Sequence, residues 1–410
     1  MKVKTVFFFA LVVLCGLSGG VWAADNRGNR VVPPRLEGGP GAAPREVPRR
    51  QPTIGPRPVT TIGPAAGPLD QPAQALEHKR LEFSVKQVGP LFEVKGASTQ
   101  VIGQGGNYAV AAGPGKILWF LNNIWIGELP SSGQPARWGI IEGGVALSAS
   151  TSPYSLKGAL DYVQDENRWP ISFLSSDFRE YIPVRKFWPR AGLKTEKKYY
   201  VFYSILNNFG NGPYDYFRVG QGLAFSDNPE GPYKKMEIGG MSAFWSDVEP
   251  AFGSAAFSDS DGQLYVYGRV MTEPGKYTAA LSRVKPGDIE SREKYEYYSL
   301  DASSGVWTSD LTEVTPVMEN MPEEFSVSYN EYLKSYLALY LDIEDAEVLL
   351  MRSDYPWGQW RAPVKIMACS KEDYCSGAKE QPLFSLEDGK RIFFTLEKKN
   401  MPYIYELTFK

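Results

Sequence analysis

The chain has 410 residues, a formal net charge of −3 and a single histidine, His78, which excludes a Ser-His-Asp triad and a histidine-based metal site. The charge is uneven: residues 1–24 carry +2 and residues 25–80 carry +4, because nine bases oppose five acids there, so residues 81–410 carry −9. An acidic domain cannot hold nucleic acid by neutralising its phosphates, so we expect no nucleic-acid partner.

Residues 1–23 have the layout of a signal peptide. Lys2 and Lys4 form a basic start, an apolar run extends from Val6 to Leu17, and Ala23 ends an acceptable cleavage site. The apolar run is shorter than the ~20 residues that a membrane-spanning helix needs. We therefore predict export to a secreted, periplasmic or cell-surface location, with no transmembrane segment after signal cleavage.

Residues 24–80 are rich in Pro, Gly and Ala and poor in aromatic residues. The sequence TIGP occurs twice, at 53–56 and 61–64. Such a segment cannot bury enough apolar surface to offset the entropy of ordering it. We predict a disordered Pro/Gly-rich linker.

From residue 81 onward, short aromatic and β-branched runs alternate with Gly, Pro, Asp and Asn, which predicts an all-β domain. A turn followed by an aromatic-rich strand occurs five times, with strands that begin at residues 117, 199, 264, 336 and 392. The spacing accommodates a four-stranded blade each time. We predict a five-bladed β-propeller over residues 81–410, with a two-sheet sandwich as the alternative.

A second repeat lies between these strands. The pattern S-D-x-P-x-G-x-aromatic occurs at 226–233 and 353–360, with a degenerate copy at 282–287. Pro presets φ and Gly permits a positive φ, so the pattern predicts turns between the two outer strands of a blade.

The strands before the five aromatic runs should line the central channel, and we place them at 107–112, 187–191, 250–257, 325–332 and 382–386. Residues just before these inner strands and just after the aromatic ones should gather at one mouth. They are Gln104, Arg185, Asp247, Glu249, Glu324 and Glu380, with Asn122, Asn123, Asn207, Asn208, Arg269, Asp342 and Glu397.

This composition suits a polyhydroxylated ligand, because acids and amides bind hydroxyls, an aromatic ring offers a flat face and arginine steadies negative charge. We predict a polysaccharide or other glycan as the partner of a monomeric protein. The predicted binding residues are Gln104, Asn123, Arg185, Trp188, Arg269, Tyr329 and Glu380.

Glycoside hydrolysis needs only two carboxyl groups, one as acid and one as base or nucleophile. Asp247 and Glu249 are the first candidates, because residues two apart on a strand point to the same side. Glu324 and Asp342 come from the next blade and could oppose them. For each acid, the alternative is a solvated loop residue.

No cofactor and no metal are expected. The glycine-rich segment 103–106 lacks the Lys of a phosphate-binding loop, and the Asp-rich segment 258–262 lacks the downstream Glu of a calcium loop. Cys369 and Cys375 are the only cysteines after the leader, and in an oxidising compartment they can form a disulfide. Two free thiols are the alternative.

Several motifs together resemble a known family: FWPRAG at 187–192, YYVFY at 199–203, GLAFS at 222–226 and FSVSYN at 325–330. They are similar to the secreted five-bladed propellers of the domain of unknown function 4185, over roughly residues 95–410. Members of that family include endo-D-arabinanases acting on mycobacterial cell-wall arabinan, so the resemblance implies a propeller fold and glycoside hydrolase-like activity.

The first blade departs from the family pattern. The hydrolases of the family that this chain resembles show the pattern D-G-x-Y-S, followed by a strand that ends in G-D-T. The resemblance implies that the aspartates of these two patterns carry the hydrolytic activity. Here Gln104 and Asn123 stand in their place, and an amide cannot act as base or nucleophile. We therefore keep two hypotheses: a secreted glycoside hydrolase-like enzyme acting on an arabinan-type polysaccharide, and a non-catalytic cell-surface propeller that binds glycan or protein.

Overall fold

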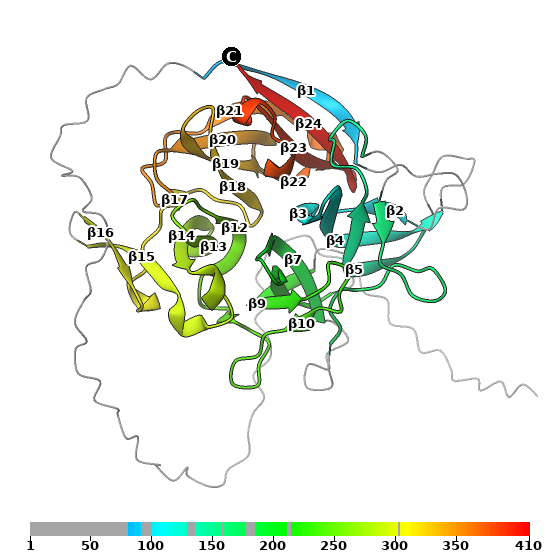
Figure 1. The fold of residues 1–410 in the computed structure, drawn as a ribbon, viewed down its shortest axis with the longest axis horizontal. Coiled ribbons are helices and arrows are strands. Elements are labelled where there is room, and N and C mark those ends of the chain that lie inside the picture. Colours follow the sequence, from blue (N-terminus) through cyan, green and yellow to red (C-terminus); the bar gives the residue numbers. More distant parts are fainter. Residues whose placement is uncertain are drawn as a thin grey trace, which may run out of the picture. The chain divides into compact units, whose positions relative to one another are not determined.

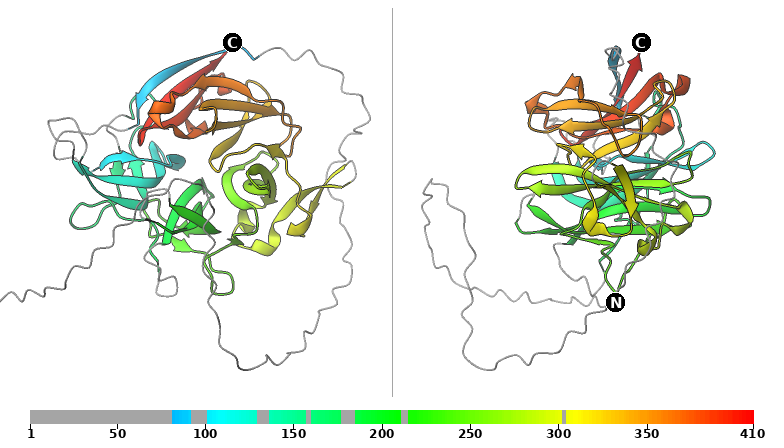
Figure 2. Two further views of the ribbon diagram at one scale, coloured as in Figure 1. Left: turned by 180° about the vertical axis from the view of Figure 1, so that it is seen from behind. Right: turned by 90° about the vertical axis from the view of Figure 1, so that its left-hand side faces the viewer.

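The computed structural model describes residues 81–91, 101–128, 136–156, 160–176, 185–210, 215–301 and 304–410. The predicted signal peptide and linker lie outside the described residues. Within the described part, the strands form five antiparallel sheets around a common axis (Figure 1). The predicted five-bladed propeller is confirmed, and Figure 2 shows the same ring from behind and from the side.

Each blade runs from an inner strand at the axis to an outer strand at the edge. Blade 1 holds β2 (Val101–Gln104), β3 (Tyr108–Gly113), β4 (Lys116–Glu128), β5 (Ala136–Ser148) and β6 (Leu160–Tyr162). Blade 2 holds β7 (Arg185–Lys194), β8 (Tyr199–Asn208), β9 (Tyr216–Ser226), β10 (Lys234–Lys235) and β11 (Trp245–Ser246). Blade 3 holds β12 (Ala251–Ser258), β13 (Leu264–Glu273), β14 (Lys276–Val284), β15 (Glu296–Asp301), β16 (Ser304–Thr308) and β17 (Met318–Glu319).

Blade 4 holds β18 (Phe325–Asn330), β19 (Ser335–Asp342), β20 (Glu347–Ser353) and β21 (Val364–Ala368). Blade 5 holds β22 (Ser376–Glu380), β23 (Arg391–Lys398), β24 (Met401–Phe409) and β1 (Phe83–Pro90). Short 3-10 helices occur at η3 (Pro286–Asp288), η4 (Arg292–Lys294), η5 (Leu311–Glu313), η6 (Lys371–Asp373), η7 (Pro382–Phe384) and η8 (Glu387–Gly389).

All five aromatic runs form the second strand of a blade, as predicted, and β8 shows why these runs are continuous. Tyr200 and Phe202 pack into the core shared with blade 3, whereas Val201 and Tyr203 pack into the core shared with blade 1. Alternate side chains of a strand point to opposite faces, and both faces are covered here by neighbouring blades. A strand buried on both faces reads as an unbroken apolar run.

The ring closes through blade 5, which combines the two ends of the domain. β1 pairs with β24, so that Phe83 lies opposite Phe409. Near the axis, Gln381 Nε2 donates to the Asn107 carbonyl at 2.7 Å and joins blade 5 to blade 1. Closure leaves the wheel without an open seam between its first and last blades.

One predicted inner strand is wrong. Residues 382–386 do not line the channel: Pro382–Phe384 form η7, and β22 at Ser376–Glu380 is the inner strand of blade 5. Pro382 has no N–H to give to a sheet ladder, and the Phe384 ring packs instead against Trp119 at 6.0 Å. The other four predicted inner segments overlap β3, β7, β12 and β18.

The repeated turns lie where we predicted. Residues 226–233 lead from β9 to β10 and residues 353–360 lead from β20 toward β21, whereas the degenerate copy at 282–287 covers the end of β14 and the start of η3. Cys369 and Cys375 form the predicted disulfide, which closes the segment between β21 and β22. In the described part of the chain, no helix has the length and apolar character to cross a membrane.

Candidate active site at the channel mouth

Irregular pairing in the inner strands turns polar side chains toward the axis. The register of β7 shifts between Pro189 and Ala191, which leaves Arg190 as an extra residue in a β-bulge. The register of β22 shifts in the same way between Ser376 and Lys379. Bulges re-aim side chains and are frequent beside active sites.

Glu324, which directly precedes β18, accepts hydrogen bonds from three other blades. Asn122 Nδ2 and Arg190 Nη1 bond its Oε1 at 2.8 and 2.7 Å, and Lys379 Nζ bonds its Oε2 at 2.9 Å. The Arg190 and Lys379 side chains are only 1% and 2% exposed. Burial acts to raise the pKa of Glu324, but the charges of Lys379 and Arg190 outweigh it and hold the pKa below its usual value.

Glu397, near the end of β23, lies beside it in a different environment. Its Oε1 accepts from the Gly106 N–H at 2.7 Å and from Asn107 Nδ2 at 3.2 Å, and its Oε2 accepts from Ser376 Oγ at 2.9 Å. Burial raises the pKa of Glu397, and the negative charge of Glu324 raises it further. No cation forms an ion pair with Glu397 among the residues that the structure describes.

The two carboxylates meet at Gly377. A Cβ at this position would lie 2.8 Å from Glu397 Oε1 and 2.9 Å from Glu324 Oε2, so these oxygens are at most 5.7 Å apart, the total of the two distances. Two neighbouring carboxyl groups whose pKa values move in opposite directions are the usual arrangement for an acid and a base that work together.

The segment between β2 and β3 is shaped to approach Glu397. A Cβ on Gly105 would lie 2.9 Å from Glu397 Oε2, and one on Gly106, where φ is +88°, would lie 2.5 Å from the Asn122 nitrogen. Only glycine lets this backbone come so close to both groups. The glycine pair of the sequence therefore serves the carboxylate site.

The two amides predicted at the first blade's end of the mouth, Gln104 and Asn123, differ in their surroundings. Gln104 is fully buried, donates from Nε2 to Asn107 Oδ1 at 3.1 Å, and accepts from the Tyr162 hydroxyl. Asn123 is on β4, and its Oδ1 is buried with no hydrogen-bond partner among the described residues. Gln104 thus orients Asn107, which in turn holds Glu397.

Asp247 and Glu249 do not form a pair on a strand. They lie in the turn between β11 and β12, where the alternation of a strand does not apply. Asp247 is exposed, whereas Glu249 accepts from the Ser246 N–H at 2.6 Å and forms an ion pair with Arg292. The structure does not bring the Glu249 carboxylate to Glu324.

Asp342 and Glu380 form no hydrogen bond with Glu324 or Glu397 among the described residues, although Asp342 lies at the mouth end of β19, two residues beyond the Tyr340–Phe325 pair. Asp342 ends β19, and its Oδ1 accepts from the N–H groups of Glu344 and Asp345 at 3.0 and 3.3 Å. Glu380 lies at the far end of β22, where Ser328 Oγ donates to it at 2.6 Å. Burial raises the pKa of Glu380 to about 7.

The remaining predicted binding residues are spread over both ends of the channel. Arg185 begins β7 and donates from Nε to Asn207 Oδ1 at 2.7 Å. Trp188 is buried and donates to Glu142 at 3.0 Å, so its ring offers no open face. Arg269 lies opposite the first residue of β12, and Tyr329 lies on β18.

The sequence prediction missed Arg190, Lys379 and Asn107. Arg190 stands inside the motif FWPRAG, and its signal is a charged residue in an otherwise apolar inner strand. Lys379 gives the same signal, because it is a charged residue that follows two small residues, Gly377 and Ala378, in the inner strand β22. Glu397 was expected at the mouth but was not among the predicted catalytic acids.

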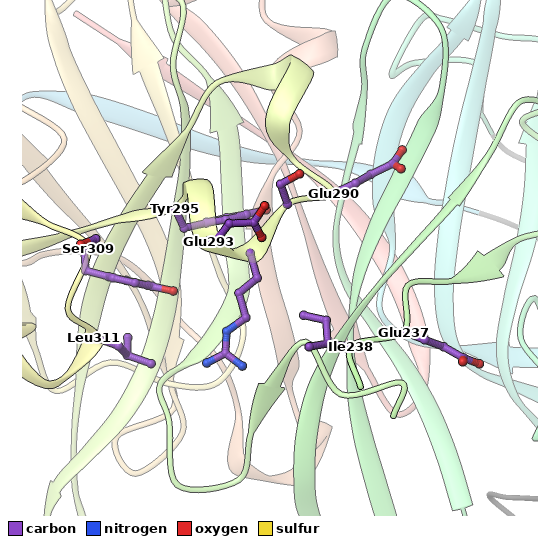
Figure 3. A pocket seen from close by; sticks show the side chains of 10 residues that line it. Glu237, Ile238, Glu290, Glu293, Tyr295, Ser309 and Leu311 are labelled. Atoms are coloured by element: carbon purple, nitrogen blue, oxygen red, sulfur yellow. The ribbon is translucent and has the colours of Figure 1, made fainter. Parts of the chain in front are cut away.

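A separate cavity of about 620 Å³ lies at the outer part of blade 3 (Figure 3). Glu237 and Ile238, which follow β10, lie on one side of it, and Ser309 and Leu311 lie on another. Glu290 also lines it and is held by Lys198 and the Tyr200 hydroxyl, each at 2.7 Å. Its wall contains no residue of the Glu324–Glu397 pair.

Comparisons with known proteins agree with this architecture. The family described as domain of unknown function DUF4185 matches residues 172–405. A provisionally named hydrolase from Bacteroides ovatus ATCC 8483 superimposes with a TM-score of 0.57 at 17% identity, over 75% of this chain and 86% of that one. At this identity, the likeness establishes the fold alone.

Two further structures are less similar. A family 117 glycoside hydrolase from Zobellia galactanivorans has a TM-score of 0.48 at 12% identity, over 80% of this chain and 90% of that one. A GH43_1 enzyme from Xanthomonas citri has a TM-score of 0.45 at 14% identity, over 79% and 90%. No curated protein sequence matches the chain.

Proposed function

We propose that this chain, which belongs to the DUF4185 family, is a carbohydrate-active propeller that binds a polysaccharide at the channel mouth and hydrolyses it with Glu324 and Glu397. One observation carries the proposal: two carboxylates from adjacent blades approach to within 5.7 Å while their pKa values move apart. In retaining glycoside hydrolases the two carboxyl groups that flank the scissile bond are about 5–5.5 Å apart, a separation that the 5.7 Å limit admits.

The roles follow from the protonation states. Glu397, whose pKa is raised, acts as the acid and donates a proton to the departing glycosidic oxygen. Glu324, whose pKa is depressed, acts on the other side of the sugar as the nucleophile, because the separation leaves no room for the water of an inverting enzyme. Asn122 and Lys379 orient Glu324, and the Gly106 N–H and Asn107 orient Glu397.

The substrate and location remain part of the proposal. The family resemblance supports an arabinan-type polysaccharide, and the predicted leader and the Cys369–Cys375 disulfide support export. Recovery of protein that begins near residue 24 from the medium or periplasm would test export. A chain retained inside the cell with its leader intact would contradict it.

Release of reducing sugar from arabinan, arabinogalactan and acidic polysaccharides tests the activity. We expect Glu397→Gln to lower kcat/KM by about 10²–10⁴-fold, because the proton donor is lost. Glu290→Gln, in the outer cavity, is the matched control and should keep wild-type activity. The pH profile should be bell-shaped, with activity lost at high pH as Glu397 ionises and at low pH as Glu324 is protonated. Turnover by Glu397→Gln equal to that of the control would refute the acid role.

A second candidate is a non-catalytic glycan-binding propeller. It is favoured by Gln104 and Asn123 in place of the family aspartates, and by the three donors that already engage Glu324. This reading predicts binding of a polysaccharide without release of sugar, at equal affinity in wild type and Glu397→Gln.

A further inference from the structure

Two more arginines reach the channel mouth beside the Arg190–Glu323 ion pair, in which Arg190 Nη2 and Glu323 Oε1 are 2.5 Å apart. Arg218 is on β9 and Arg269 is on β13 (Figure 1). Arg269 pairs with Ala251, the first residue of the inner strand β12, so it lies level with the mouth. Blades 2 and 3 thus supply three guanidinium groups to one end of the channel.

The Arg218 guanidinium donates hydrogen bonds to backbone carbonyl groups rather than to a carboxylate. Its Nη1 donates to the Ser246 carbonyl at 3.0 Å, and its Nη2 donates to the carbonyls of Asp247 and Glu249 at 2.6 and 2.9 Å. Carbonyl groups accept hydrogen bonds without carrying a formal charge. Within the described ranges, no carboxylate forms an ion pair with Arg218.

Arg269 has fewer partners still. Its guanidinium lies 3.3 Å from the centroid of the Tyr277 ring, and its Nε is buried without a hydrogen-bond acceptor among the described residues. A buried guanidinium N–H without an acceptor costs free energy, which the contact with the ring offsets only in part. An acceptor brought by a ligand would remove that cost.

The electrostatics favour an anion at this position. Burial lowers the pKa of Arg218 and of Arg269, the charge of Glu323 opposes the shift, and repulsion from Arg190 adds to it. Residues 81–410 carry a net charge of −9, so a cluster of three arginines around Glu323 is a local exception in an acidic domain. Glu323 forms its ion pair with Arg190, and the charges of Glu323 and Asp247 act on Arg218 from further away, but neither Arg218 nor Arg269 forms an ion pair among the described residues.

Resting on the proposed function, we propose that the mouth selects a polysaccharide that carries oxyanion groups, carboxylate or sulfate, and that Arg269 binds this group with support from Arg218. The planar fork of a guanidinium matches an oxyanion with two parallel hydrogen bonds. The anionic substituent would lie beside the Glu324–Glu397 pair and fix the register of the sugar chain.

Matched ligands test this inference by calorimetry at low salt: oligogalacturonate against its methyl ester, and dextran sulfate oligomers against dextran. Wild type should bind a charged member about tenfold more tightly than its neutral counterpart, and the preference should shrink as salt screens the charges. Arg269→Gln should lose the preference, and Arg269→Lys should keep only part of it. Arg361→Gln, whose arginine pairs with Asp354 on blade 4, is the control and should keep all of it.

A second measurement separates this inference from the proposed function. In wild type, D-glucuronate or glucose 6-sulfate should shift the Nε–Hε NMR signal of Arg269, whereas D-glucose should not. That shift without binding or cleavage of any polysaccharide would support the anion site and refute the proposed function. Binding or cleavage of neutral polysaccharide without charge preference and without the shift would overturn the anion site alone.

Discussion

The axis of the propeller and the outer cavity of blade 3 both place carboxylates beside cations, but the two clusters differ in burial and in connectivity. At the axis, Arg190 and Lys379 are almost fully buried, and both bind Glu324. At the cavity, Lys198 and Glu290 form a pair with side chains 29% and 32% exposed. Water solvates the charges of the Lys198–Glu290 pair in both the folded and the unfolded chain. The buried charges at the axis are stabilised in the folded protein mainly by one another.

This difference teaches how function and stability are divided. A buried ion pair is seldom a source of stability, because desolvation costs as much as the attraction returns. Two cations, Arg190 and Lys379, and three carboxylates, Glu323, Glu324 and Glu397, at the axis therefore call for a reason other than folding. The proposed chemistry at the mouth would supply that reason, whereas ordinary surface pairing accounts for the Lys198–Glu290 pair at the cavity.

The largest expected effect is that of Arg190→Met. This substitution removes the ion-pair partner of Glu323 and leaves Lys379 as the only cation paired with Glu324. Both carboxylates lie near the axis. We expect the free energy of unfolding at pH 7 to fall by about 3–5 kcal/mol, measured by urea denaturation. Because the folded pKa of Glu324 is depressed below 4.5, the loss should shrink as the pH falls below about 4.5 and through that lower folded pKa. A loss that does not change with pH would contradict the electrostatic explanation.

Glu380→Gln should instead raise the free energy of unfolding at high pH. Burial raises the pKa of Glu380 from 4.5 to about 7, so the native state holds this proton more tightly than the unfolded chain does. Wild-type stability should therefore decline as pH rises from about 4.5 to 7, by roughly 3 kcal/mol in total. Urea denaturation at pH 8 should show Glu380→Gln as the more stable protein, and at pH 4 the two should be equal. The exposed Glu344→Gln should behave like wild type, and equal pH dependence in all three would contradict the assignment.

Removal of the disulfide by Cys369→Ala with Cys375→Ala should cost about 2 kcal/mol. The cross-link closes a short loop just before β22, which carries Ser376 and Lys379 to the axis. In thermal melts, reductant should lower the Tm of the wild type to that of the double variant. The Tm of the double variant should not change with reductant. No difference between oxidised and reduced wild type would mean that the cross-link does not constrain this segment.

The smallest effect is expected for Lys198→Met at the outer cavity. Its pair with Glu290 is one-third exposed, and pairs of this kind contribute less than about 1 kcal/mol. This variant is the matched control for Arg190→Met in the same denaturation series. A loss as large as that of Arg190→Met would remove the distinction between the two clusters.

The fold could be predicted from the sequence because the second strands are buried on both faces. The run Tyr199–Tyr203 reads as continuous aromatic sequence for that reason, and together with its four counterparts it indicated the number of blades. The inner strands are less regular, and β22 was misplaced because Leu383 and Phe384 look like strand residues although they belong to η7.

The site could be predicted only in part. Glu324 and Glu397 were expected at the mouth from their positions at strand ends, but their pairing depends on the approach at Gly377, which sequence spacing does not reveal. Arg190 reaches Glu324 because a bulge breaks the alternation of β7. Sequence reasoning assumes that the side chains of a strand alternate between its two faces, and it would assign Arg190 to a face on that basis. Contacts that depend on a bulge therefore cannot be predicted in this way.

The most direct test of the central claim is a crystal structure of Glu397→Gln with a bound oligosaccharide from the polysaccharide that the protein recognises. We predict a sugar at the channel mouth, with a glycosidic oxygen within hydrogen-bond distance of residue 397 and with Glu324 on the opposite side of the ring. A sugar bound instead in the cavity lined by Glu290 and Tyr295, with the mouth free of ligand, would contradict the account.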